Sequence, residues 1–292
     1  MAGSTKNTRE RRSGESGDRD SQNWTTRHTV ALVALIVLIF VIGLIPTNHV
    51  IPGFAPPAQG LVVWLIMIFL FGLCFVLIGK GMTGLWEGLL IDSRNRMSLS
   101  RLQLVLWTVV VISSLLAIAL LNIREHPKDT KPLDIIVPPQ VWGLLGISTA
   151  SFVTAATIKS QKKNVNATEK AKTKTAEALS KVGDDPGKLA APQGSLVAYQ
   201  RPDDASVSDL FKGDEVVSAA YLDLGKVQVF LFTIIVVFTY AVAVGAKLYG
   251  AHDAIKSLPD LSSGIVAVLG ISHAGYLTSK AVPSNPADQD RG

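Results

Sequence analysis

The sequence has little charge for its length and almost no cysteine. Charged residues make up 17% of the 292 residues, hydrophobic residues make up 48%, and the mean hydropathy is +0.34. A soluble domain of this size carries far more charge on its surface. The single cysteine, Cys74, lies in an apolar run. One chain can therefore form neither a disulfide nor a multi-cysteine metal site.

The sequence also lacks the short motifs that carry catalysis. No Walker A, HExxH, GxSxG or CxxC pattern occurs in it, and no nucleophile has a base beside it in a recognisable pattern. His49, His126 and His252 come from three separate segments without the paired spacing of metal ligands. We therefore expect no enzymatic activity, no cofactor and no metal.

Long uncharged runs dominate what is present. Runs of this length predict bilayer-spanning helices. The first run has no cleavage pattern directly after it, which favours an uncleaved anchor over a signal peptide. Six spans are predicted, at Thr29–Ile45, Leu61–Gly79, Leu102–Leu121, Val137–Ile158, Val227–Tyr249 and Gly264–Ser279.

Two pieces of the sequence recur in the same order. The stretch LSRLQLVLWT at 99–108 aligns with LGKVQVFLFT at 224–233, at an offset of 125, and LGIS at 145–148 recurs at 269–272. Internal self-similarity of this kind indicates a repeated unit. Each unit holds two spans, so both copies enter the membrane in the same direction. The predicted fold is an all-α polytopic membrane protein of six transmembrane helices with an internal parallel two-helix repeat.

The remaining segments complete a division of the chain into seven parts. The 80–101 segment should hold a short interfacial helix around Trp86. In the insert, 162–181 should be a solvated helix or coil, 183–202 flexible, and 211–223 a second interfacial helix. The parts are a disordered tail (1–28), a transmembrane hairpin (29–79), the interfacial segment (80–101), a first repeat hairpin (102–158), a partly disordered insert (159–222), a second repeat hairpin (223–280) and a C-terminal tail (281–292).

The distribution of basic residues predicts the orientation. With six spans, only 5 of the 28 Lys and Arg residues fall on the side opposite the two termini. Basic residues concentrate on the cytoplasmic side of membrane proteins, so both termini and the insert are expected there. This distribution also explains the formal charge of +5 without nucleic-acid binding.

Candidate site residues recur at matched positions of the two units. Arg101 and Lys226 each lie two residues before a glutamine, Gln103 and Gln228. The simpler interpretation is that the cations are anchors that fix helix depth. The alternative is a polar cluster in which the two glutamines bond across helices and Asp92 or Asp223 pairs with the cations.

Two further features fall inside the last helices of the units. Gly146 and Ala150, like Gly270 and Ala274, form small-xxx-small motifs that predict close packing between the fourth and sixth spans. His273, next to Ser272, is the one ionisable side chain near the middle of a span. It is either a neutral imidazole bonded to a neighbouring helix or a group that handles protons or solutes.

The SLSRLQLVLWT helix followed by LGIS resembles a two-helix unit of uncharacterised bacterial polytopic membrane proteins. The resemblance covers Met97–Ile158 and, more loosely, Asp223–Pro283. It implies a bacterial cytoplasmic membrane and carries no activity. The long insert departs from it.

These features predict a non-enzymatic membrane anchor or scaffold. Its cytoplasmic segments would hold a protein partner, with the lipid bilayer around the bundle and self-association left open. The alternative is a small channel or transporter whose polar track includes Gln103, Gln228, Ser272 and His273.

Overall fold

The computed structural model describes residues 24–45, 56–126, 131–251 and 253–282. The described chain is helical and holds no strand beyond isolated bridges. Most of the tails expected at 1–28 and 281–292 lies outside these residues. The described α-helices are α1 (Thr26–Leu44), α3 (Gln59–Thr83), α4 (Leu99–Glu125), α5 (Pro139–Lys162), α6 (Glu169–Lys181), α7 (Leu224–Leu248) and α8 (Ser263–Ala281).

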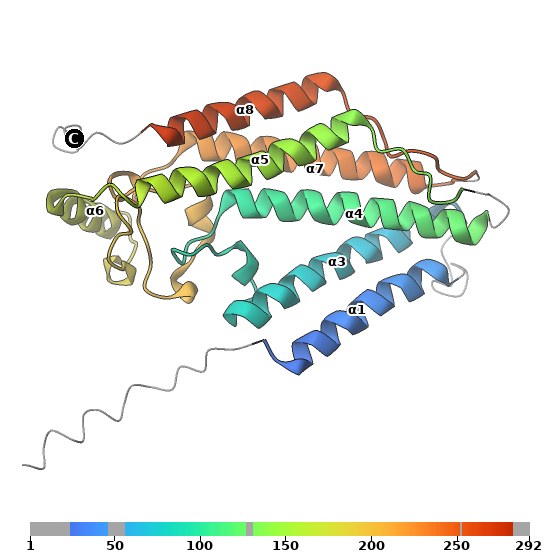
Figure 1. The fold of residues 1–292 in the computed structure, drawn as a ribbon, viewed down its shortest axis with the longest axis horizontal. Helices are drawn as coiled ribbons and strands as arrows, with labels where there is room; N and C mark the ends of the chain where they lie inside the picture. Colours follow the sequence, from blue (N-terminus) through green and yellow to red (C-terminus); the bar gives the residue numbers. More distant parts are fainter. Residues whose placement is uncertain (1–23, 46–55, 127–130, 252, 283–292) are drawn as a thin grey trace, which may run out of the picture.

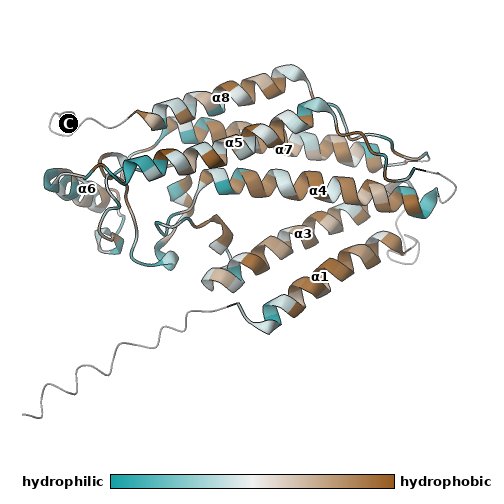
Figure 2. Cartoon of the chain, in the orientation of Figure 1, coloured by the Kyte–Doolittle hydropathy of each residue, from teal (hydrophilic) through white to brown (hydrophobic). Residues whose placement is uncertain are grey.

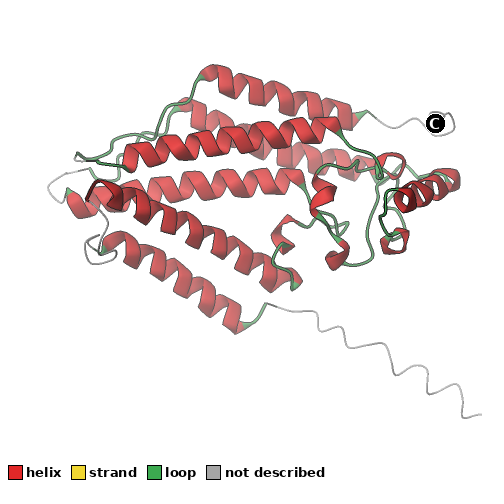
Figure 3. Cartoon of the chain, turned by 180° about the vertical axis from the view of Figure 1, so that it is seen from behind, coloured by secondary structure: helices red, strands yellow, loops and turns green. Residues whose placement is uncertain are grey.

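The long helices lie side by side as one bundle (Figure 1). Helix α4 is central because it packs against α1, α3, α5 and α7, and α8 packs against α5 and α7. The core contains Trp64 of α3, Trp107 of α4 and Tyr240 of α7, with the rings of Trp107 and Tyr240 centred 6.1 Å apart. Helix α6 and the loops around it gather at one end of the bundle, as the view from behind also shows (Figure 3).

The apolar residues follow the long helices, and the hydrophilic residues gather at the end that holds α6 (Figure 2). Among the described helices, five are long and apolar enough to cross a membrane: α1, α3, α4, α5 and α7. The all-α prediction is thus confirmed for the described residues, and five of the six predicted spans coincide with helices long and apolar enough to cross a membrane. Helix α8 is not one of the five, so the sixth span stays a prediction.

The helices extend beyond the predicted runs at their polar ends. Helix α3 continues past Lys80 and ends where Gly84 adopts a left-handed conformation, with φ of 80°. Lysine is a good helix former, so Lys80 continues the helix, and its ammonium lies over the Trp86 ring, 3.7 Å from the centroid. The predicted interfacial helix around Trp86 is wrong: this segment holds a single 3₁₀ turn, η2 (Gly88–Leu90).

The insert is more ordered than the sequence predicted. Segment 183–202, expected to be flexible, has buried side chains at Leu196, Val197 and Tyr199. Its backbone pairs with neighbouring segments, since the Val197 amide donates to Asp214 O (3.0 Å) and the Tyr199 amide to Arg94 O (2.9 Å). The second interfacial helix is likewise a single turn, η6 (Val216–Ser218). Of the solvated helix or coil predicted for 162–181, the structure has a helix, α6, over Glu169–Lys181.

At the opposite end of the bundle, the buried side-chain amide of Asn122 joins α4 to the loop before α8. Asn122, near the end of α4, donates to Ile255 O (2.9 Å) and accepts from the Ile255 amide (2.9 Å). The loop before α5 pairs with the loop before α8 through Ile136, whose amide donates to Lys256 O. These bonds hold the α4–α5 and α7–α8 hairpins in register at this end.

Candidate functional site: a buried ion-pair network at the end of the bundle

A tight turn between η2 and α4 carries two buried arginines. Asp92 and Met97 flank the turn: the Asp92 amide donates to Arg96 O (2.9 Å), and a bridge joins Ile91 to Met97. Asn95 has a φ of 58°, which lets the chain reverse here. The side chains of Arg94 and Arg96 point into the insert and are only 2% and 1% exposed.

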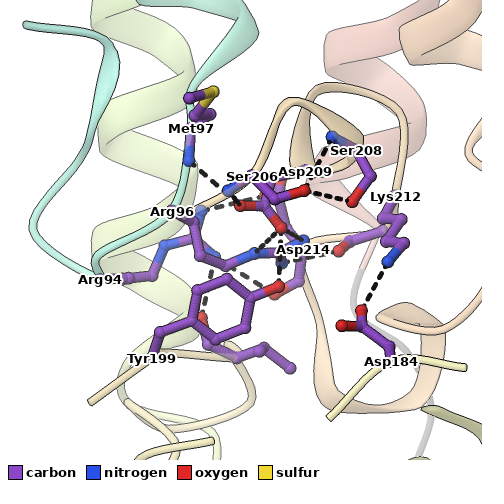
Figure 4. A network of polar contacts seen from close by, with 12 residues as sticks. Arg94, Arg96, Met97, Asp184, Tyr199, Ser206, Ser208, Asp209, Lys212 and Asp214 are labelled. Carbon is purple, nitrogen blue, oxygen red and sulfur yellow. Dashed lines mark hydrogen bonds and ion pairs between the residues drawn. The ribbon is translucent and has the colours of Figure 1, made fainter. Parts of the chain in front are cut away.

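Arg96 forms a buried pair with Asp209 of the insert (Figure 4). The guanidinium donates to the Asp209 carboxylate from Nε (3.2 Å) and Nη2 (3.1 Å), and from Nη1 to Gly213 O (2.8 Å). Asp209 is 1% exposed and also accepts from the Tyr199 hydroxyl (2.7 Å). Burial, together with the charge of Asp209, raises the pKa of Tyr199 well above its usual range, so the phenol stays protonated and donates.

Asp214 joins the turn to the ends of two helices. Its carboxylate pairs with Arg94 (3.0 Å), with Lys226 in the first turn of α7 (3.2 Å), and with Lys280 near the end of α8. Burial alone would raise the pKa of Asp214, but Lys226, Lys280 and Arg94 outweigh it and hold that pKa well below its usual value. The carboxylate is therefore ionised throughout the physiological range.

Helix α5 joins the same network through two lysines. Lys159 pairs with Asp92 (2.9 Å), which also pairs with Arg94 (2.9 Å), and Lys162 pairs with Glu215 of the insert. The insert is therefore bound by charge to the turn before α4 and to the ends of α5, α7 and α8. Buried pairs of this kind add little net stability, because removing charges from water is costly, but breaking one by removing a single partner is strongly destabilising.

The predicted anchors Arg101 and Lys226 occupy different surroundings. Arg101 donates from Nη1 to Leu89 O (3.2 Å) and Ile91 O (2.8 Å) and does not pair with Asp92. The Lys226 ammonium pairs with Asp214, while Asp223 accepts from the Lys226 backbone amide (3.1 Å). The predicted pairing with Asp92 or Asp223 is therefore wrong, because those carboxylates bind Arg94 and Lys159 or cap a helix.

A second polar cluster lies inside the bundle and takes one side chain from each of four helices. Gln103 of α4 donates to Thr233 Oγ1 of α7 (2.9 Å), and its Nε2 lies 3.5 Å from His273 Nε2 of α8. His273 Nδ1 contacts Ser151 Oγ of α5 at 2.5 Å. All four side chains are buried. His273 thus bonds neighbouring helices, as the simpler interpretation of this residue expects.

Two members of the predicted polar track are not in this cluster. Gln228 is exposed on α7, so the predicted bond between Gln103 and Gln228 is wrong, and Thr233 takes its place. Ser272 is buried, but its hydroxyl has no hydrogen-bond partner among the described residues. The same holds for Ser148, its counterpart in the sequence alignment.

The small-xxx-small motifs contribute little to packing. Helices α5 and α8 do pack together, but Gly146, Ala150 and Ala274 are exposed, and a Cβ on Gly146 would meet no atom within 4 Å. The close approaches are at Gly143, where a Cβ would lie 3.3 Å from Val266, and at Gly270. Of the four predicted packing residues only Gly270 faces the partner helix.

Sequence reasoning missed the residues that build the ion-pair network. Tyr199 lies in the 183–202 segment that was predicted to be flexible, Asp214 lies in the predicted interfacial helix at 211–223, and Asp209 lies between them. The available signal was the dense alternation of charge in IDSRNRMS at 91–98, directly before an apolar helix. Arginines at such a position need carboxylate partners, and the aspartates and glutamates of the insert can supply them.

Comparison with known proteins finds no matching family model, no matching curated protein and no matching solved structure.

Proposed function

We propose that this protein is a non-enzymatic membrane scaffold. Its bundle anchors the insert (159–222) and holds it in one orientation at the cytoplasmic face, where a protein partner binds. The observation that carries the proposal is the buried network that joins Arg96 to Asp209 and Asp214 to Lys226 and Lys280. Burying one ion in a protein costs roughly several kcal/mol of desolvation free energy. An insert that served only as a flexible tether would not need to bury so many charges.

In this proposal α8 is the sixth span, and α4–α5 and α7–α8 are the two repeat hairpins. Its support is that α4 begins at Leu99 and α7 at Leu224, the offset of 125 found in the sequence. The ends that carry the insert are also rich in Lys and Arg, the distribution expected at a cytoplasmic face. Both termini are then cytoplasmic, in the cytoplasmic membrane of a bacterium.

The arrangement favours a scaffold over the channel or transporter. Gln103 and His273 use their polar atoms in bonds between helices, whereas a conducting path needs groups that face water. Neither side chain lines the large apolar groove between α3, α4 and α7.

The test is photo-crosslinking from the exposed face of α6 in intact membranes. A photoreactive amino acid at Thr173 or Glu177, both exposed, should give a discrete protein adduct. Leu133, which is 68% exposed at the opposite end of the bundle, is the matched control and should not give that adduct.

A second arm uses Asp209→Asn, which weakens docking of the insert while leaving α6 intact. The adduct from Glu177 should become weaker in this variant. An adduct equally strong in wild type and Asp209→Asn, or no protein adduct from either α6 position, would contradict the scaffold.

A further inference from the structure

A small polar pocket lies between the start of α4 and the end of α5, beside the ion-pair network. Its volume is about 160 Å³, well above the space that one water molecule needs. One wall is polar and comes from the turn before α4, the first turn of α4 and the last turns of α5. The other wall is apolar and is formed by Phe152, Ala155 and Ala156 of α5.

Two serines with little exposed surface line this pocket. Ser98 and Ser100 are 7% and 6% exposed, and neither side chain has a hydrogen bond to any described residue. Ser98 is the N-cap of α4, yet its side chain does not cap the helix. The first amides of a helix have no acceptor within the helix, so the positive end of α4 is left open to an anion here.

The charges that line the pocket are predominantly positive. Lys163 is exposed, and its ammonium has no partner among the described residues. Arg101 contacts only carbonyl oxygens, so its charge is not paired with a carboxylate in the described chain. Arg94 and Lys159 share one carboxylate, Asp92.

At the corresponding place at the start of α7, carboxylates of the chain itself occupy the helix N-terminus and pair with the cation. Asp223 stands 125 residues after Ser98 and caps α7 by accepting from the Lys226 amide (3.1 Å). The Lys226 ammonium has Asp214 at 3.2 Å. At the start of α4 a neutral serine replaces the capping carboxylate, and the cation Arg101 has no acidic partner.

We propose that this pocket binds the phosphate of an anionic phospholipid. The hydroxyls of Ser98 and Ser100, the open end of α4 and the Lys163 ammonium recognise the phosphate. The apolar wall belongs to α5, a helix long and apolar enough to cross a membrane, and this favours a lipid over a soluble phosphate ester. The proposal is independent of any protein partner of the insert.

Native mass spectrometry of the purified full-length protein in detergent tests this site. The probes are phosphatidylglycerol and phosphatidylcholine with identical acyl chains, and wild type should bind the first more tightly. Lys163→Ala should weaken phosphatidylglycerol binding about fivefold, the loss expected for one interfacial cation. Lys181→Ala, which removes an exposed lysine on α6, is the control and should leave binding unchanged.

Ser98→Asp gives the sharper test because it places a carboxylate where α7 carries Asp223. Aspartate is a good N-cap, so the variant should fold at least as well as wild type. It should lower phosphatidylglycerol affinity about tenfold or more, whereas Ser98→Asn, which caps without charge, should retain the preference for phosphatidylglycerol. Equal affinity for the two lipids in wild type, or unchanged binding in Ser98→Asp, would overturn the proposal. Displacement of the lipid by millimolar glycerol phosphate would assign the pocket to a soluble phosphate ester and would also overturn it.

Discussion

Asp209 is a residue whose change should weaken the docking of the insert. It is 1% exposed, and its carboxylate accepts from Arg96, from the Tyr199 hydroxyl and from the Ser206 amide. Asp209→Asn leaves the Arg96 charge buried without a counter-ion, which costs about 3–5 kcal/mol. The thermal unfolding midpoint of the purified protein should fall, and protease should cut the insert at lower concentration.

Asp203→Asn is the matched control for this change. Asp203 pairs with Arg201 at 3.2 Å, but both side chains are more than half exposed. An exposed pair contributes about 0–1 kcal/mol, so this variant should behave as wild type. Equal destabilisation by the two substitutions would contradict the importance of the buried network.

Asp92 and Asp214 predict how stability depends on pH. Burial would raise the pKa of each carboxyl, but Arg94 and Lys159 at Asp92, and Lys226, Lys280 and Arg94 at Asp214, outweigh it and lower both pKa values. In the unfolded chain the aspartate pKa is about 3.9, the model-peptide value. As the pH falls below about 5, these carboxyls therefore bind more protons in the unfolded chain than in the native chain. These two carboxyls should therefore make the unfolding midpoint fall as the pH is lowered below about 4.

The variant Asp214→Asn separates this effect from general acid denaturation. It lacks the carboxylate, so it should be less stable at neutral pH and should show a shallower decline on acidification. A wild-type protein that gains stability between pH 5 and pH 3 would contradict the assignment.

At the scale of the helices, the bond between Gln103 and Thr233 predicts a coupling between α4 and α7. A double-mutant cycle of Gln103→Leu and Thr233→Val, measured as free energy of unfolding in detergent or bilayer, should give an interaction of about 0.6 kcal/mol, the average for hydrogen bonds between membrane helices, and at most about 1.7 kcal/mol. Gln228→Leu changes an exposed residue and is the control. An interaction near zero would mean that the cluster does not hold these helices together.

Glycines distinguish true close contacts between elements from sequence motifs that resemble them. A Cβ on Gly79 would lie 2.6 Å from the backbone nitrogen of Leu89, so Gly79→Ala must push η2 away from α3. We expect a loss of about 1–3 kcal/mol in unfolding free energy, the usual range for overpacking. Gly146→Ala meets no atom within 4 Å and should be neutral or stabilise α5 by about 0.5–1 kcal/mol. The reverse order of the two variants would contradict the α3–η2 contact.

Sequence patterns predicted where the helices are, but not which faces of them pack. Charge-free runs locate α1, α3, α4, α5 and α7 because a bilayer core excludes charge. The faces are harder to predict because nearly every residue of such a helix is apolar. Gly146 and Ala150 therefore gave a false packing motif, and Thr233 and Ser151 were overlooked as partners of Gln103 and His273.

At the scale of the whole molecule, the prediction that segment 183–202 of the insert is flexible was wrong. Composition alone predicted flexibility, because Gly194 and the prolines of 183–202 break regular structure. Gly194 instead has a φ of 67° and lies so close to α5 that a Cβ would be 2.4 Å from Lys162 O. The insert is ordered by long-range contacts with Arg94, Arg96 and Lys226, which no local pattern in the insert reveals.

The central claim is that a membrane-embedded bundle carries the docked insert on its cytoplasmic side. Cysteine labelling tests it most directly, with single cysteines introduced as Lys181→Cys in α6 and Leu133→Cys at the opposite end, in a Cys74→Ser background. A membrane-impermeant maleimide applied to intact spheroplasts should label position 133 at once and position 181 only after permeabilisation. Labelling of position 181 in intact spheroplasts, or of both positions from the same side, would contradict the account.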